Sequence, residues 1–343
     1  MSNQTMQNYM RTVLFVLLLV GLVWFVNKVS HVIALVTISL MLVYALFPLT
    51  EYLENKRKFS HILAVIVTYV CFLLILLALI GLVVPVMLSE IQGVAKELPT
   101  YIQQIQLLIE EGVMELEFFD VGPEITSFVQ SLSTNLQPVL EEIASFSISL
   151  ISSFINIFFI MFIVFYLLYD FKNIRSQIVE LLPGKYKNQG EDVIGIFDDN
   201  LGRFIRGNII RCTIVGVLTG LVFFAVGMPY AFLLGVLAGA LNVILYIGPY
   251  IAAAPAVLLS FSANTPSFLF VVITYVVINI IDGVLLSPLL LGRAVRLKPI
   301  TVIVALLIGA ELAGVLGMII STPIAGIIKG LVEYFTKGKE KAA

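Results

Sequence analysis

Charged side chains are scarce along this chain. Only 12% of the 343 residues are Asp, Glu, Lys or Arg, whereas 60% are hydrophobic, and the mean hydropathy is +1.06. Too few polar side chains are present to coat a soluble globule of this length. The net charge of −2, with no basic stripe, gives no indication of nucleic-acid binding. The composition therefore predicts an integral membrane protein.

Motifs for catalysis and metal binding are missing as well. The two histidines, His31 and His61, lie at the ends of apolar runs, and the chain has no HExxH motif, P-loop or Cys/His cluster. Cys71 and Cys212 each lie in or beside an apolar run, so no disulfide framework is predicted. We expect no enzymatic activity, no resident metal and no cofactor.

Long apolar runs predict about six membrane-spanning helices, since one crossing needs roughly 20 apolar residues. The first run follows Arg11 without a signal-peptide cleavage site, so we expect it to be retained. A short link at Asn27–His31 separates it from the second. The predicted spans are Thr12–Val26, Val32–Pro48, Ile62–Val86, Ser145–Tyr169, Ile209–Val226 and Phe268–Leu291.

The charges in the loops predict the topology. Basic residues mark cytoplasmic loops, and they cluster at Lys56–Lys58 and within residues 170–208. Residues 89–145 instead carry ten acidic residues against one base, Lys96, which places this insert outside. Apolar positions recur every three or four residues over 91–109 and 125–143, so the insert is predicted to be a hairpin of two amphipathic helices. It would form a subunit contact or pathway mouth, or else lie on the membrane or pack on itself.

Two further apolar segments, Tyr230–Ser262 and Pro299–Phe335, are too long for one crossing and too short for two. Each contains glycines and prolines near its middle, and paired interruptions of this kind point to the binding site of a transporter. The breaks are Gly248, Pro249 and Pro255 in the first segment, and Gly309, Gly314, Gly317 and Pro323 in the second.

The parity of crossings predicts that both segments are re-entrant hairpins. The loop at Arg293 is basic and hence cytoplasmic, but three simple crossings from residues 170–208 would place it outside. The conflict disappears if the first segment returns to the outer side. The second starts and ends beside basic residues, so it returns to the cytoplasmic side. The hairpins would enter from opposite faces, as in an inverted repeat.

These boundaries divide the all-α chain into six parts. Residues 1–88 form a membrane scaffold of three spans, 89–145 the external hairpin, 146–169 the fourth span and 170–208 a cytoplasmic loop. An apolar stripe over 193–204 predicts that this loop contains an interfacial helix with a solvated acidic face. Residues 209–335 form a transport unit, in the order span, hairpin, span, hairpin. Residues 336–343 are a basic tail, and both termini are predicted to be cytoplasmic.

Polar residues in the transport unit are the candidate site. Asp282 interrupts a span and Glu311 lies beside the break in the last hairpin, where a carboxylate costs about 2.5–3.5 kcal/mol on insertion scales. Asn242 and Asn279 add uncharged ligands. The two carboxylates would bind a cation such as Na⁺ transiently, or exchange protons. Alternatively they are structural, bonding to backbone amides freed by the broken helices, or to Arg211 or Arg293.

Several motifs resemble one family of membrane proteins. The segments Asn279–Arg293 and Leu297–Pro299, then Gly309, Gly314–Met318 and Pro323, are similar to the C-terminal signature of the autoinducer-2 exporter family. Pro48–Leu53, Leu182-Pro183 and Asn242–Pro249 extend the similarity over nearly the whole chain. The resemblance implies an oligomeric transporter of the bacterial cytoplasmic membrane. Some members are linked to autoinducer-2 export and others to exchange of sodium or lithium for protons.

We therefore expect a secondary transporter that exports a small polar solute, similar to autoinducer-2, by ion-coupled alternating access. One alternative is a Na⁺(Li⁺)/H⁺ antiporter. An alternative of another class is a non-transporting membrane partner of an envelope complex that docks through the acidic hairpin. The expected partners are membrane lipid, the solute or a monovalent cation and proton, and further copies of the chain.

Overall fold

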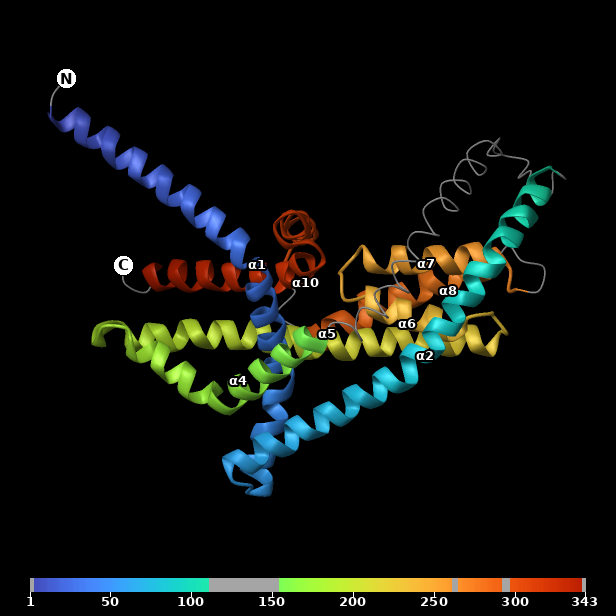
Figure 1. The fold of residues 1–343 in the computed structure, drawn as a ribbon, viewed down its shortest axis with the longest axis horizontal. Helices are drawn as coiled ribbons and strands as arrows, with labels where there is room; N and C mark the ends of the chain where they lie inside the picture. The colour runs from blue at the N-terminus through green and yellow to red at the C-terminus, as the bar shows by residue number, and fades with distance from the viewer. Residues whose placement is uncertain (1–2, 111–153, 261–264, 292–296, 341–343) are drawn as a thin grey trace.

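The structure, a computed structural model, describes residues 3–110, 154–260, 265–291 and 297–340, and these are helical apart from short turns. The α-helices are α1 (Asn3–Arg57), α2 (His61–Glu110), α4 (Phe154–Glu180), α5 (Lys187–Ala225), α6 (Ala231–Leu241), α7 (Gly248–Leu259), α8 (Phe268–Ile281), α9 (Ser287–Leu291) and α10 (Pro299–Glu340). A 3₁₀ turn, η1 (Gly184–Tyr186), precedes α5, and a π-helical turn, η2 (Asp282–Leu286), joins α8 to α9. Figure 1 shows their arrangement.

Within the described residues, six helical segments are long and apolar enough to cross a membrane. This number agrees with the prediction, but the six segments are not the same as those predicted. They are Lys28–Arg57, His61–Val94, Ile155–Glu180, Gly184–Ala225, Phe268–Leu290 and Pro299–Thr336. Helices α6 and α7 are apolar but shorter, with 11 and 12 residues.

The N-terminal helices α1, α2 and α4 pack on one another and share a core. Val43 of α1, Val65 of α2, and Val164 and Leu168 of α4 form its fully buried centre. The predicted link at Asn27–His31 is wrong, because α1 is helical without interruption through these residues. Neither proline nor glycine occurs in that link, so nothing in it ends a helix.

The predicted end of the third span also needs correction. Helix α2 continues past residue 89 to Glu110, so the first amphipathic segment of the predicted external hairpin is a helical extension of the span. The turn at residues 120–123 and the second amphipathic segment, 125–143, lie outside the described residues. The predicted start of the fourth span, residues 145–153, lies outside them too.

Helix α5 combines two elements that the sequence separates. The predicted interfacial helix over 193–204 and the predicted span from Ile209 are one helix, Lys187–Ala225. Figure 1 shows it as a long rod beneath α6 and α8. Asn208 and Arg211, two polar residues near the junction of the predicted parts, are buried against neighbouring helices and do not form a loop. The predicted boundary at residue 208 therefore does not coincide with a break in the helix.

Helix α6 lies against α5 over a surface made of glycines. A Cβ atom added to Gly216 of α5 would lie 2.9 Å from the carbonyl oxygen of Gly235 of α6, and one added to Gly235 would lie 2.8 Å from the Cα atom of Gly220. A Cβ atom added to Gly239 of α6 would likewise lie 2.9 Å from the carbonyl oxygen of Cys212 of α5. Small residues at such an interface let the backbones of two membrane helices approach closely.

Helices α6 and α7 form a compact pair joined by the turn at residues 242–247. Gly248 begins α7 directly against the end of α6, where an added Cβ would lie 1.9 Å from the carbonyl oxygen of Leu241. Pro249 follows in the first turn of α7, where its missing N–H costs nothing. Residues of α5, α6, α7 and α8 share a buried core centred on Phe223, Leu234, Leu259 and Val271.

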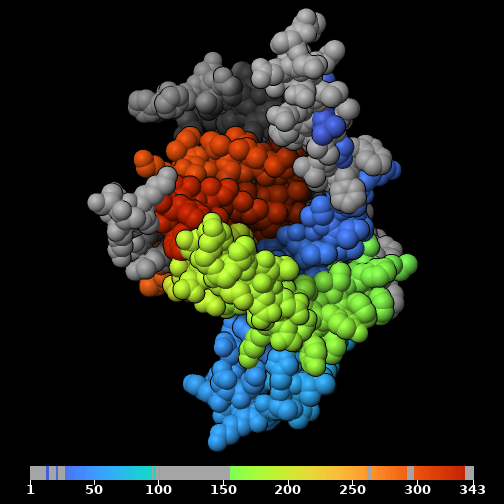
Figure 2. All heavy atoms as spheres, turned by 90° about the vertical axis from the view of Figure 1, so that its left-hand side faces the viewer, coloured from blue at the N-terminus to red at the C-terminus, as the bar shows by residue number. Residues whose placement is uncertain are grey.

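Helix α10 folds back on itself. Its backbone leaves the helical conformation at Ala313 (φ −149°, ψ 24°) and Gly314 (φ 56°, ψ −138°). Beyond this break Gly317 contacts Gly309, since a Cβ on Gly309 would lie 2.3 Å from the carbonyl oxygen of Gly317. In a continuous helix, residues eight apart would be about 12 Å apart. Figure 2 shows the orange and red parts of α10 side by side.

The last turns of α10 lie along the start of α5. The hydroxyl group of Tyr334 donates a hydrogen bond to Asp192 at 2.7 Å, and an added Cβ on Gly330 would lie 2.9 Å from Ile196. A second contact joins α5 to the N-terminal helices, where Asp198 accepts a hydrogen bond from Tyr44 at 2.8 Å and pairs with Arg175 at 2.9 Å. Asp198 is thus bound within the protein, although a solvated face was predicted.

Candidate functional site

A buried ion pair joins α5 to the junction of α8 and η2. The Arg211 Nη1 atom lies 2.8 Å from the Asp282 Oδ2 atom, and the two residues are 3% and 5% exposed. Removing two charges from water costs several kcal/mol per ion, which the pair recovers only with further hydrogen bonds. The side chains around the pair supply these hydrogen bonds.

Every remaining donor contact of Arg211 goes to an asparagine. Its Nε and Nη2 atoms donate to the Asn208 Oδ1 atom at 3.1 and 2.9 Å, and Nη2 also donates to the carbonyl oxygen of Asn242. The amide group of Asn242 in turn donates to the Asp282 Oδ2 atom at 3.4 Å. Because Asn242 caps the C-terminus of α6, the guanidinium group lies at the negative end of that helix dipole.

Asp282 retains one oxygen without a bond. Its Oδ1 atom is buried and has no hydrogen-bond partner among the described residues. Leaving a buried acceptor unsatisfied costs about 1–3 kcal/mol, and more for a charged group. An unpartnered acceptor on a residue that lines a cavity is a candidate ligand for a cation, a proton or a polar solute.

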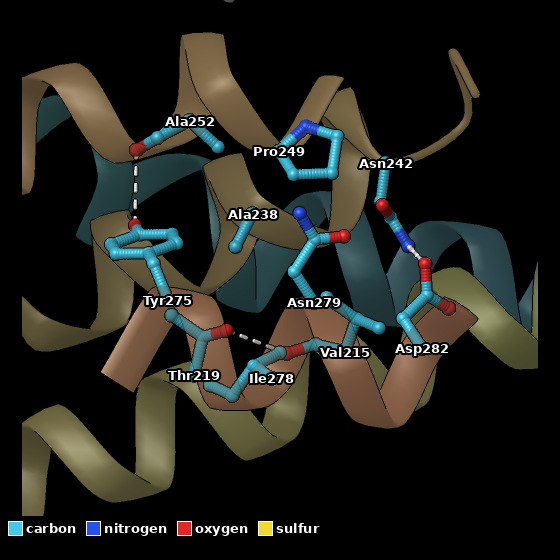
Figure 3. A pocket seen from close by; sticks show the side chains of 10 residues that line it. All are labelled: Val215, Thr219, Ala238, Asn242, Pro249, Ala252, Tyr275, Ile278, Asn279 and Asp282. Atoms are coloured by element: carbon cyan, nitrogen blue, oxygen red, sulfur yellow. Dashed lines mark hydrogen bonds between the residues drawn. The ribbon is translucent and has the colours of Figure 1, made fainter. Parts of the chain in front are cut away.

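The cavity beside this carboxylate lies between α5, the α6–α7 pair and α8 (Figure 3). It has room for about one water molecule. Its polar lining comes from Thr219, Asn242, Tyr275, Asn279 and Asp282, and its apolar lining from Val215, Ala238, Pro249, Ala252 and Ile278. The Tyr275 hydroxyl donates to the carbonyl oxygen of Ala252 at 3.0 Å, which ties α8 to α7.

The π-helical turn positions Asp282 for these contacts. The N–H of Ser287 donates to the carbonyl oxygen of Asp282, five residues back. Pro288 follows and has no N–H to continue the ordinary pattern. Turns of this kind in otherwise regular helices are frequent at functional sites, and here one begins at the buried carboxylate.

The structure brings together three of the four predicted ligands. Asn242, Asn279 and Asp282 line one cavity, together with Pro249, and Arg211 is the partner of Asp282. Glu311 is exposed near the bend of α10, does not line the cavity, and makes no ion pair within the described ranges. Arg293 lies outside the described residues.

Other predicted breaks fall where the backbone turns or packs closely. Gly248 lies at the α6–α7 turn, and Gly309, Gly314 and Gly317 make the bend of α10. Pro255 and Pro323 instead lie inside α7 and α10.

Sequence reasoning missed Asn208, Thr219 and Tyr275. Asn208 precedes Arg211 by three residues on one helix, so both side chains share a face, and this spacing could have identified it. Thr219 and Tyr275 are single polar residues in apolar runs, and they carry no local signal that separates a lining residue from a packed one. Within the described residues, no group of three or more His, Cys, Asp or Glu side chains could hold a metal.

Comparison with known proteins agrees with this architecture. A sequence model described as "AI-2E family transporter" matches residues 13–337. The chain belongs to this family. It is similar to "Putative transport protein YrrI" of Bacillus subtilis (strain 168), with 30% identity over 88% of this chain and 85% of that protein. It is also similar to "AI-2 transport protein TqsA" of Escherichia coli (strain K12), with 24% identity over 98% of this chain and 95% of that protein.

A third relative of this AI-2E transporter is "Putative permease PerM" of Escherichia coli (strain K12), with 25% identity over 74% of this chain and 70% of that protein. The family and these relatives confirm the predicted resemblance. They carry the names of transport proteins and permeases, so the chain is a membrane transporter and not an enzyme. It is an integral membrane protein with bacterial relatives, and six helices among the described residues are long and apolar enough to cross a membrane.

Proposed function

We propose that this protein is a secondary transporter that exports a small polar solute by ion-coupled alternating access. The observation that carries the proposal is the buried Asp282 carboxylate, which has one unpartnered oxygen and belongs to a residue that lines a cavity between α5, the α6–α7 pair and α8. Buried ionisable groups within spans typically mark substrate or ion pathways. An autoinducer-2-like solute is proposed because TqsA is named an AI-2 transport protein.

The hairpin geometry supports re-entry into the membrane. Helices α6 and α7, with 11 and 12 residues, are about 17 Å long, roughly half the thickness of the hydrocarbon core. The first arm of α10 ends at the bend after 14 residues, from Pro299 to Leu312, and is about 21 Å long. We propose that the two hairpins enter from opposite faces of the bacterial inner membrane, with both termini cytoplasmic.

A Na⁺(Li⁺)/H⁺ antiporter is the second candidate, favoured by the size of the cavity. Pockets for small organic molecules measure roughly 300–1,000 Å³, whereas this cavity holds about one water molecule. A monovalent cation would fit beside Asp282 without any widening. An organic solute requires α6–α7 to move away from α8.

A flux assay tests both candidates. Purified protein in liposomes is tested for autoinducer-2 movement and for sodium-driven proton movement. We expect Asp282→Asn to lower the active flux roughly 10- to 100-fold, because a lost charge-assisted hydrogen bond costs about 1.5–3 kcal/mol. Glu311→Gln is measured alongside, since Glu311 was also a predicted ligand.

The matched control is Asp199→Asn, whose side chain is 70% exposed, and we expect wild-type flux from it. Unchanged flux in the Asp282 variant would refute the coupling role. Absence of flux for every solute in the wild-type protein would favour the non-transporting docking partner.

Cysteine labelling tests the opposite entry of the hairpins. In a chain with Cys71 and Cys212 replaced by serine, single cysteines are placed at Tyr250 in α7 and at Leu312 before the bend of α10, which are 72% and 80% exposed. We expect an impermeant maleimide to reach them from opposite sides of the membrane. Reaction of both from one side only would contradict the proposed topology.

A further inference from the structure

Helix α6 has a charged side chain at each end, and each comes from a different neighbour. At its N-terminus, the backbone N–H of Leu233 donates to the Glu90 Oε2 atom of α2 at 2.6 Å. Tyr230, the residue at the N-cap, provides no side-chain cap of its own. Glu90 therefore satisfies, from another helix, an N–H that helices usually cap with a neighbouring Ser, Thr or Asp. Its negative charge also suits the positive end of the helix dipole.

Tyr230 completes the contact between α2 and α6. Its ring lies on Gly93, where an added Cβ would be 2.6 Å from the Tyr230 Cε1 atom and 2.8 Å from its hydroxyl oxygen. The Tyr230 hydroxyl group also donates a hydrogen bond to the carboxylate of Glu97 in α2. Tyr230 adopts a left-handed conformation (φ 58°) to do so, which is uncommon for a residue with a side chain.

The other end of α6 is held much more firmly. There Arg211 of α5 donates to the Asn242 carbonyl oxygen and pairs with Asp282, and the glycines of α5 and α6 are in backbone contact. Within the described residues, α2 meets the transport unit chiefly at α6. A movement of α2 away from α6 would therefore break the Glu90 contact while α5 and α6 stay together.

We propose that Glu90 is a positioning residue, a latch that holds the α6–α7 hairpin against α2 in this conformation and must open during the transport cycle. The inference rests on the proposed function, because it assigns this contact to one of two alternating conformations. Figure 1 shows α2 leaving the N-terminal helices and crossing beside α6. Breaking the latch shifts the population toward the other conformation.

The test measures exposure of Val94, which lies one turn from Glu90 and is 2% exposed. Full-length protein in liposomes carries Val94→Cys in the background without Cys71 and Cys212, and maleimide labelling is followed over time. We expect Glu90→Ala to raise the labelling rate about tenfold, in line with the loss of a helix N-cap. Glu90→Gln keeps an acceptor oxygen and should fall between the two rates. Glu51→Ala, which changes an exposed glutamate of α1, should leave the rate unchanged.

A second cysteine separates a latch from general loosening. Val43 is fully buried in the core of α1, α2 and α4, so Val43→Cys should label equally slowly with Glu90 or with alanine at position 90. Equal Val94 labelling in all variants, or faster labelling at both positions in Glu90→Ala, would overturn the latch. Labelling needs no flux, so selective acceleration at Val94 without transport of any solute would uphold the latch and reject the proposed function.

Discussion

Replacing Arg211 with alanine should cost about 3–5 kcal/mol of folding free energy, because it leaves the Asp282 carboxylate buried without its partner. The guanidinium group also satisfies Asn208 and the carbonyl group of Asn242, so these acceptors lose their donor as well. We expect the melting temperature in detergent to fall by roughly 10 °C. Transport should be lost, since the end of α6 is no longer fixed beside the cavity.

The double variant Arg211→Met/Asp282→Leu distinguishes a stability loss caused by an unpaired charge from one caused by lost packing. It removes both charges and keeps apolar volume, and replacement of a buried ion pair in this way is often neutral or stabilising. We expect it to recover most of the lost melting temperature while remaining inactive. If the double variant is as unstable as Arg211→Ala, the instability does not come from an unpaired buried charge.

The second large effect is expected from Gly317→Ala in α10. The new Cβ would lie 1.8 Å from the carbonyl oxygen of Gly309, so the two arms of α10 must move apart. Overpacking a well-packed contact typically costs about 1–3 kcal/mol, and a clash with backbone cannot be relieved by a change of rotamer. We expect lower thermal stability and a loss of flux.

Gly81→Ala is the matched control, because an added Cβ on Gly81 of α2 meets nothing within 4 Å. Alanine also has the higher helix propensity by about 1 kcal/mol, so this variant should be as stable as the wild type or more so. Equal behaviour of the two variants would show that the arms of α10 do not meet as described.

The sequence predicted the helical class and the two broken segments because both depend on local chemistry. Apolar runs identify membrane helices by length. Gly248 directly follows the turn between α6 and α7, and Gly314 lies at the bend of α10. Helix boundaries were harder to predict. Nothing in Asn27–His31 ends a helix, and the polar residues near Asn208 resemble a loop until α5 buries them. Whether a polar residue is solvated or packed depends on its neighbours in space.

The candidate site was predicted only in part for a similar reason. Asp282 and Asn242 are conspicuous in apolar surroundings, and the structure places both at one cavity. Glu311 is just as conspicuous in sequence but lies exposed near the bend of α10. The free-energy cost of placing a charge in the membrane identifies an unusual residue. Whether its side chain faces a cavity or the surface depends on the rotation of the helix and on the neighbouring helices, which local sequence does not specify.

The neutrality of the Arg211–Asp282 pair has an electrical consequence. A single charge that crosses the full membrane field exchanges about 2.3 kcal/mol per 100 mV, but a guanidinium and a carboxylate 2.8 Å apart move as one dipole with no net charge. Displacement of α5 together with η2 would then transfer almost no charge by itself. A current measured across a planar bilayer would then report the net charge of the solutes and ions moved in each cycle, with almost no contribution from the pair itself.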